Sequence, residues 1–260
     1  MPKFAANVST MFPDVPVEAR FRAARDLGFT AVEYLFPYAQ SPAEVKAGVC
    51  EAGVAMILLN TPLGDVANGE RGLAAVPGRE ADFRRDFDRA MAYAVDVGVP
   101  MIHVMAGVVD VADRDTAEAV LVRNVRVAAD LAAGHGIDVL LEPLNTEDTP
   151  GYFLTRTDET RQLIDSIERD NVRLQFDFYH RQIMEGNLER RLEENLDVIG
   201  HIQFSSVPGR HEPQHGEVNM AYLFAACDRL GYDGWVGCEY RPKTTVREGL
   251  TWAAAYGLGA

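Results

Sequence analysis

Cysteine is scarce in this 260-residue chain: Cys50, Cys227 and Cys238 lie far apart and form no CxxC pair. This spacing excludes a zinc site made of cysteines, and isolated thiols are typical of proteins in a reducing compartment. Long apolar runs are missing too, because none reaches the roughly 18 residues that a membrane-spanning helix needs. The first residues also lack the apolar core of a signal peptide. We therefore expect a cytoplasmic protein without a membrane span.

Clusters of basic residues are absent as well. The net charge at pH 7 is −14 and the sequence pI is about 4.8. Because such a chain repels phosphate backbones, nucleic-acid binding would need a local basic groove, and no Lys/Arg cluster supplies one. No P-loop, GxSxG or GxGxxG motif is present either. We therefore expect neither nucleic acid nor a membrane among the partners.

The chain does show a regular alternation of short apolar runs and longer amphipathic segments. The short runs predict strands at residues 4–7, 31–34, 54–59, 101–104, 138–142, 172–177, 199–205 and 235–240. The longer segments predict helices at residues 17–27, 42–52, 80–97, 113–133, 158–167, 188–195, 220–230 and 245–256. Glycines follow five of these helices, where a left-handed C-cap favours them. The pattern predicts an α/β fold, a (β/α)8 TIM barrel forming a single domain over residues 1–260.

One connection, residues 60–79, is much longer than the others and contains four glycines and two prolines. In a barrel it would follow the third strand and lie on the face where active sites are found. Long loops in compact domains often act as lids. A lid and a mobile surface loop are both compatible with this sequence.

The fifth to eighth predicted strands each carry an oxygen-bearing side chain at or near the carboxyl end: Glu142, Asp177, Gln203 and Glu239. They are separated by roughly one βα unit of ~30 residues, so adjacent strands bring them to the same end of the barrel. Burying such a carboxylate without a partner would cost several kcal/mol. Carboxylate and amide oxygens suit a hard divalent ion such as Mg²⁺ or Mn²⁺. Ordinary strand-end acids pairing with helix N-termini are the alternative, but four in succession favour a metal site.

Three further side chains are candidates for substrate binding. His180 follows Asp177 by three residues and could orient a ligand or the substrate, although a solvated histidine fits equally well. His103 lies in an apolar strand, where it faces either the barrel mouth or the core. Arg210 lies in a loop just beyond Gln203, and its guanidinium fork matches the two oxygens of a substrate carboxylate. An exposed surface arginine is the alternative for Arg210.

The segment from His211 to His215 matches the H-E-x-x-H pattern of zinc proteases. That motif binds zinc only on a continuous helix. Pro213 lies inside the segment, and proline is disfavoured in a helix interior. We therefore expect a loop here and no zinc protease site.

Seven motifs together resemble those of the hydroxypyruvate isomerase family, within the xylose-isomerase-like barrel superfamily. They are EYLFPY (33–38), HVMAG (103–107), EPLN (142–145), DFYH (177–180), QIMEG (182–186), PGRHEP (208–213) and GYDGWVGCEYRP (231–242). The resemblance implies a divalent metal on Glu142, Asp177, Gln203 and Glu239. It also implies that Glu142 and Glu239 form the proton-transfer pair. A departure occurs at Phe204-Ser205-Ser206, where a small apolar and glycine-like stretch is expected; alternation turns Ser205 to the same side as Gln203.

The resemblance implies an isomerase that interconverts hydroxypyruvate and tartronate semialdehyde. A metal would stabilise the enediolate while one glutamate removes a proton and the other returns it. Relatives that act on 2-oxo-tetronate keep that larger acid open as the alternative substrate. A metal-dependent sugar epimerase or dehydratase on the same barrel also stays open, as does a non-catalytic metabolite-binding protein. The expected partner is a small 2-oxo hydroxy acid, and a homo-oligomer is possible.

Overall fold

The computed structural model describes residues 1–259, and in this part of the chain eight parallel strands close into one barrel in sequence order. The last strand pairs with the first, with Lys3 opposite Trp235, so the sheet has no free edge. This confirms the predicted (β/α)8 barrel. The strands are β1 (Lys3–Asn7), β2 (Ala31–Glu33), β3 (Ala55–Asn60), β4 (Met101–His103), β5 (Asp138–Leu141), β6 (Val172–Asp177), β7 (Ile199–Phe204) and β8 (Trp235–Cys238).

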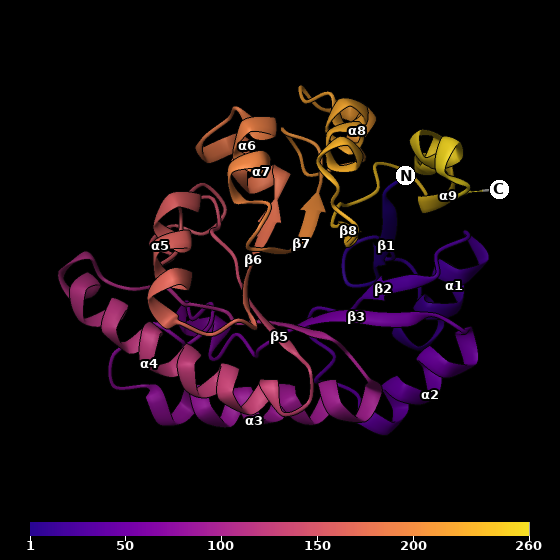
Figure 1. Cartoon of the computed structure of the whole chain (residues 1–260). Helices are drawn as coiled ribbons and strands as arrows, with labels where there is room; N and C mark the ends of the chain where they lie inside the picture. Colours follow the sequence, from indigo (N-terminus) through magenta and orange to yellow (C-terminus); the bar gives the residue numbers. More distant parts are fainter. Residues whose placement is uncertain (260) are drawn as a thin grey trace.

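Helices cover the outside of the barrel and carry the chain from each strand to the next (Figure 1). They are α1 (Arg20–Asp26), α2 (Pro42–Ala52), α3 (Glu80–Val97), α4 (Arg114–Ala133), α5 (Thr157–Ile167), α6 (Phe178–Met184), α7 (Leu188–Asn195), α8 (Met220–Leu230) and α9 (Val246–Gly249). Short 3-10 helices are η1 (Val17–Ala19), η2 (Val66–Asn68), η3 (Val111–Asp113), η4 (Pro213–His215) and η5 (Leu250–Tyr256).

Two helix predictions need correction. No helix was predicted directly after β6, but helix α6 lies there, and Asp177 caps it by accepting a hydrogen bond from the Tyr179 backbone N–H at 2.9 Å. The predicted last helix is instead the short α9 followed by the 3-10 helix η5. Gly249 and Gly257 are the N-cap and C-cap of η5, which is a 3-10 helix of seven residues.

Side chains inside the barrel form an apolar floor below a polar layer. The floor is a separate cluster of buried residues, Ala5, Ala31, Ile57, Leu58, Met101 and Leu140. Successive side chains of a strand point to opposite faces, so the inward positions recur every second residue. Two residues beyond Ala5, Ala31, Leu58, Met101 and Leu140, the inward positions carry the buried polar side chains of Asn7, Glu33, Asn60, His103 and Glu142. The interior therefore changes from apolar to polar toward the carboxyl ends of the strands.

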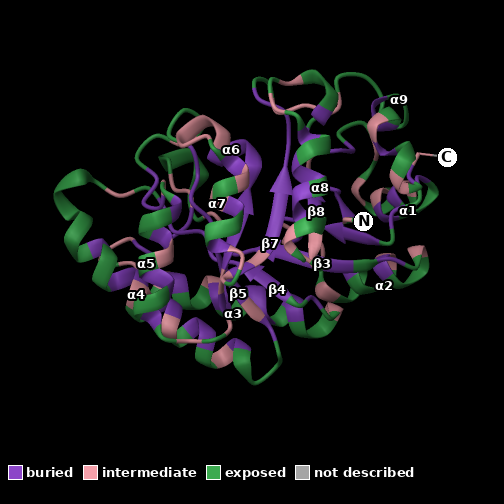
Figure 2. Cartoon of the chain, turned by 45° about the horizontal axis from the view of Figure 1, so that its top comes forward, coloured by how far each residue is buried: buried purple, intermediate pink, exposed green. Residues whose placement is uncertain are grey.

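The main apolar core lies between the barrel and the helices, where Figure 2 shows the inner helix faces buried and the outer faces exposed. Phe204 of β7 packs there against Phe4, Phe224 and Trp252, with ring centroids 6.0, 4.9 and 5.3 Å away. Its ring points away from Gln203, as strand alternation predicts. The departure from the family pattern at Phe204 therefore does not enlarge or fill the barrel mouth.

The long connection after β3 is anchored in its second half. Gly72 pairs with Ala106, and Leu73, Ala74 and Ala75 are buried. A Cβ on Gly72 would lie 2.3 Å from the Met105 carbonyl oxygen, so only glycine fits this close approach. Residues 64–69 are exposed, and the lid stays a prediction for these residues alone.

The H-E-x-x-H segment forms the 3-10 helix η4 and no continuous α-helix. His211 points its Nδ1 at the Arg241 carbonyl oxygen, 2.8 Å away, while buried Glu212 accepts a hydrogen bond from the Lys243 backbone N–H at 3.2 Å. The motif therefore ties two loops together, as expected from Pro213. Within the described residues, no helix has the length and apolar character needed to span a membrane.

Phe204→Ala should lower the free energy of unfolding by about 3–5 kcal/mol, because it removes a fully buried ring from an aromatic cluster. Urea unfolding measures the loss. Val111→Ala is the matched control, since Val111 is 87% exposed and its truncation should change stability by less than about 0.5 kcal/mol. Equal, small losses for both variants would show that the cluster contributes little to stability.

Candidate active site

The four predicted metal ligands lie at the carboxyl ends of β5 to β8 and are all buried. Asp177 closes β6 and pairs in register with Gln203 of β7. Glu142 and Glu239 are the first residues after β5 and β8. Parallel strands of a closed barrel place their carboxyl ends around one mouth, so these four side chains share it.

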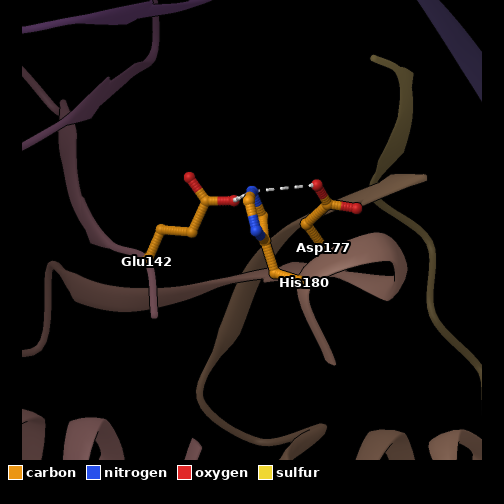
Figure 3. A group of neighbouring side chains, drawn as sticks. All are labelled: Glu142, Asp177 and His180. Carbon is orange, nitrogen blue, oxygen red and sulfur yellow. Dashed lines mark ion pairs between the residues drawn. The ribbon is translucent and has the colours of Figure 1, made fainter. Parts of the chain in front are cut away.

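The tightest group in the mouth is Glu142, Asp177 and His180, whose ligand atoms lie within 4.8 Å of one another. Figure 3 shows the His180 ring between the two carboxylates, with Nε2 3.6 Å from Asp177 Oδ2 and 4.0 Å from Glu142 Oε1. Neither of these oxygens has a hydrogen-bond partner among residues 1–259. Buried oxygens without partners are costly, so their position indicates a ligand.

His180 is held in a defined tautomer. The Asn145 backbone N–H donates to Nδ1 at 3.0 Å, so a neutral ring carries its proton on Nε2, facing the carboxylates. Burial lowers the pKa of His180 well below its ordinary value, and the charges of Arg210 and Arg181 lower it further. His180 thus presents a neutral N–H donor to the mouth, and the sequence-based alternative of a solvated histidine is wrong.

Gln203 is joined to Glu142 through a residue that the sequence analysis missed. The Nε2 of Gln175 donates to Glu142 Oε2 at 3.0 Å and to Gln203 Oε1 at 2.6 Å. Gln175 lies two residues before Asp177 on β6. Period-two alternation places the two on the same face, so this signal was available in the sequence.

Glu239 is paired with Arg210, whose Nη2 lies 2.6 Å from Glu239 Oε1 and 3.8 Å from Asp177 Oδ2. The Arg210 guanidinium also stacks on the Tyr179 ring, 4.8 Å from its centroid. Arg210 is therefore no surface arginine, and its charge faces the predicted ligands. Glu239 adds no atom to the compact group of three.

Burial and mutual repulsion shift the three carboxyl groups toward neutrality. Burial raises the pKa of Glu142 well above its ordinary value, and the charges of Glu239 and Asp177 raise it further. Burial also raises the pKa of Asp177 to about 6 and that of Glu239 to about 7, although Arg210 opposes both shifts. A bound divalent cation would relieve this repulsion, and hard oxygen ligands suit such an ion. The Glu142 and Asp177 carboxylates of this buried group could therefore hold a metal, with the His180 Nε2–H beside them.

His103 also faces the mouth, with Nδ1 3.5 Å from Glu142 Oε2. Burial lowers its pKa to about 3, with a further effect from His201, so the ring is neutral at physiological pH. Neither ring nitrogen has a hydrogen-bond partner in the described part of the chain. A core histidine with satisfied hydrogen bonds, the alternative considered for His103, is therefore excluded.

Known proteins similar to this chain match it over nearly its whole length. The family model for the xylose isomerase-like TIM barrel matches residues 21–256. The 2-oxo-tetronate isomerase of Cupriavidus necator is 49% identical, covering 98% of this chain and 99% of the relative. The hydroxypyruvate isomerase of Escherichia coli is 40% identical, covering 98% and 100%. The crystal structure of an AP endonuclease, family 2, from Brucella melitensis has a TM-score of 0.97 at 46% identity, covering 98% and 99%.

The closed barrel and its mouth of buried carboxylates define the chain as a TIM-barrel protein with an acidic candidate active site. The chain belongs to the xylose isomerase-like TIM barrel family, within the group of the hydroxypyruvate and 2-oxo-tetronate isomerases. It is an isomerase, which confirms the resemblance found in its motifs.

Saturating Mn²⁺ should raise the melting temperature more at pH 8 than at pH 5.5. The pKa values of Asp177 and Glu239 are about 6 and about 7 in the folded protein, above their ordinary values of 3.8 and 4.5. Because these pKa values are raised in the folded state, the stability of the metal-free protein should fall as pH rises from about 4 to about 7. Metal binding requires the deprotonated forms of the two groups, so a bound metal should offset this loss at high pH. Thermal unfolding with and without Mn²⁺ measures this, with Asp177→Asn as the variant that should lose most of the gain. An equal gain at both pH values would contradict it.

Proposed function

We propose that the chain isomerises a 2-oxo acid that carries a hydroxyl on the neighbouring carbon, and that 2-oxo-tetronate is preferred to hydroxypyruvate. The observation that carries the reaction type is the meeting of Glu142, Asp177 and Glu239 in one buried mouth, with pKa values raised toward neutrality. The preferred acid departs from the sequence-based first choice, hydroxypyruvate. Three relatives named 2-oxo-tetronate isomerase are 44–49% identical, whereas the Escherichia coli hydroxypyruvate isomerase is 40% identical, and this supports the larger acid.

The two acids share every group that reacts. Each has a carboxylate, a carbonyl at C2 and a hydroxyl at C3, and 2-oxo-tetronate adds one terminal hydroxymethyl group. Moving a proton from C3 to C2, and the hydroxyl proton from the C3 oxygen to the C2 oxygen, converts the 2-oxo acid into its 3-oxo isomer, or hydroxypyruvate into tartronate semialdehyde. The reaction therefore needs one group that takes a proton and one that gives it.

A divalent cation would be held by the four predicted ligands, Glu142, Asp177, Gln203 and Glu239. Their oxygen donors favour Mg²⁺ or Mn²⁺. A cation bound there would act as a Lewis acid and stabilise the negative charge that develops on the substrate oxygens. The unpartnered oxygens of Glu142 and Asp177 support this fit.

Glu142 and Glu239 are proposed to transfer the proton. They follow different strands, β5 and β8, and so approach the mouth from different sides. A pKa of about 7 lets Glu239 exchange a proton readily near neutral pH, which is the condition for efficient general acid–base catalysis. Its partner Arg210 lowers that pKa, so Arg210 keeps part of the Glu239 population ionised.

Arg210, His180 and His103 are proposed to bind the substrate. Arg210 offers a guanidinium fork to the carboxylate, which would then compete with Glu239 for it. His180 directs its Nε2–H between Glu142 and Asp177, where it can donate to a substrate oxygen. His103 adds a neutral ring with two unsatisfied nitrogens on the β4 side. An endonuclease activity, suggested only by the name of the Brucella melitensis protein, is disfavoured by the net charge of −14.

The purified protein should convert 2-oxo-tetronate with a higher kcat/KM than hydroxypyruvate, because additional binding energy from the terminal hydroxymethyl group can be used in the transition state. One extra group of this size is worth about 10–200-fold in selectivity. The assay follows product formation by NMR for both acids, with and without a chelator. A higher kcat/KM for hydroxypyruvate would restore the first choice, and turnover of neither acid would refute the proposed function.

Glu142→Gln and Glu239→Gln should each lower kcat by about 10²–10⁴-fold, since each removes a titratable group from the proton transfer. The double variant should lose little more than the worse single one, because the two groups act in one step. Glu147→Gln is the control, as this acid lies in the same loop as Glu142 but is exposed. Near-normal turnover by Glu239→Gln would contradict the two-glutamate mechanism.

A further inference from the structure

Glu33 is a fully buried carboxylate in the polar layer of the barrel, and nothing so far gives it a part in the site. It lies at the end of β2, on the opposite side of the barrel from β5 and β6 in strand order. Its Oε2 accepts hydrogen bonds from Asn7 Nδ2 and from Gln203 Nε2, both at 2.9 Å. Its Oε1 contacts His201 Nε2. Glu33 therefore touches one of the four proposed ligands of the cation.

The contact with Glu33 determines which way the Gln203 amide points. An ionised carboxylate only accepts hydrogen bonds, so the amide must turn its NH2 group toward Glu33. The reversed amide would place Gln203 Oε1 against the carboxylate oxygens in a buried space, where repulsion is strong. The oxygen of Gln203 is thereby directed to the side of the mouth where Gln175 and Glu142 lie.

Gln175 extends the same polarity to the proton-transfer residue. Its Nε2 serves two acceptors, Gln203 Oε1 at 2.6 Å and Glu142 Oε2 at 3.0 Å. If the Gln203 amide reversed, an NH2 group would face the Gln175 NH2 group and this hydrogen bond would be lost. Glu33 thus fixes the orientation of the Gln203 amide, which accepts from Gln175, and Gln175 in turn donates to Glu142.

The Glu33 side chain fits in the barrel because the facing residue of β8, Gly237, has no side chain. A Cβ on Gly237 of β8 would lie 1.8 Å from Glu33 Oε1 and 2.9 Å from Gln203 Cγ. Gly237 is also the register partner of Gln203. A glycine at this point of β8 is therefore required for Glu33 to reach Gln203, which is an observation independent of the hydrogen bonds.

We propose that Glu33 is a positioning residue: it holds the Gln203 and Gln175 amides so that the Gln203 oxygen, and not its NH2 group, is offered to the cation. The inference rests on the proposed cation site, and it predicts an effect on metal affinity before any on chemistry. Groups that orient metal ligands in this way typically change affinity by about 10–100-fold when removed.

The test measures Mn²⁺ affinity by titration calorimetry, without substrate. Glu33→Ala should raise the Kd for Mn²⁺ by at least ~10-fold, whereas Glu33→Gln, which keeps an acceptor oxygen for Gln203, should recover most of the affinity. Asn7→Ala is the matched control, because it removes another buried hydrogen bond to the same Glu33 oxygen but leaves the contact with Gln203. A merely structural role would weaken Mn²⁺ binding equally in Glu33→Ala and Asn7→Ala, and an unchanged Kd in Glu33→Ala would also overturn the proposal.

Gly237→Ala keeps every charge and tests the same point if Glu33→Ala fails to fold. The added methyl group displaces Glu33 from Gln203, so Mn²⁺ binding should again weaken by at least ~10-fold, and binding at wild-type affinity would refute the inference. The wild-type protein separates this inference from the proposed function. Tight Mn²⁺ binding without turnover of either acid would overturn only the function, whereas no Mn²⁺ binding at all would overturn the cation site and the role of Glu33 with it.

Discussion

The repulsion among three buried carboxylates at the barrel mouth is the constraint on which the rest of the site depends. The charges of Glu239 and Asp177 raise the pKa of Glu142 beyond the effect of burial, and the charge of Asp177 also raises that of Glu239. The described part of the chain offers Arg210 as the cation that pairs with Glu239 and approaches Asp177. Charge of this density in a buried place is unstable without more compensation. A divalent cation is the partner that would restore the balance of charge.

The closed barrel is what makes this arrangement possible. Alternation along each strand directs apolar residues to the floor and polar residues to the layer above it. Because the polar layer rests on a packed apolar floor, its side chains are held from below as well as from the sides. Neutral histidines and amides, which can donate without adding charge, fill the positions around the carboxylates. Packing and hydrogen bonds thus orient these side chains before any ligand binds, and oriented polar groups favour catalysis.

The fold, and the placement of the four predicted ligands at one barrel mouth, could be derived from the sequence because both depend on local patterns. Short apolar runs ended at Glu142, Asp177 and Glu239, and parallel strands bring their ends together. Gln175 and Glu33 were missed because their roles depend on contacts across the barrel, although alternation already placed them on the inner face. The pairing of Arg210 with Glu239 depends on a loop in which Arg210 has a positive φ of 53°, and no residue pattern predicts that. Helix α6 was missed because it has only seven residues, too few for a clear period.

Isomerisation in D₂O tests the central claim most directly. If one glutamate takes the proton from C3 and a different one gives a proton to C2, the proton that is delivered comes from solvent. Each molecule of product formed from 2-oxo-tetronate should then carry one deuterium at C2, as read by proton NMR and mass spectrometry early in the reaction. Product formed at the same rate without deuterium would mean that the hydrogen removed from C3 is the one delivered to C2, by a single base or by direct transfer, and the two-glutamate account of this site would be wrong.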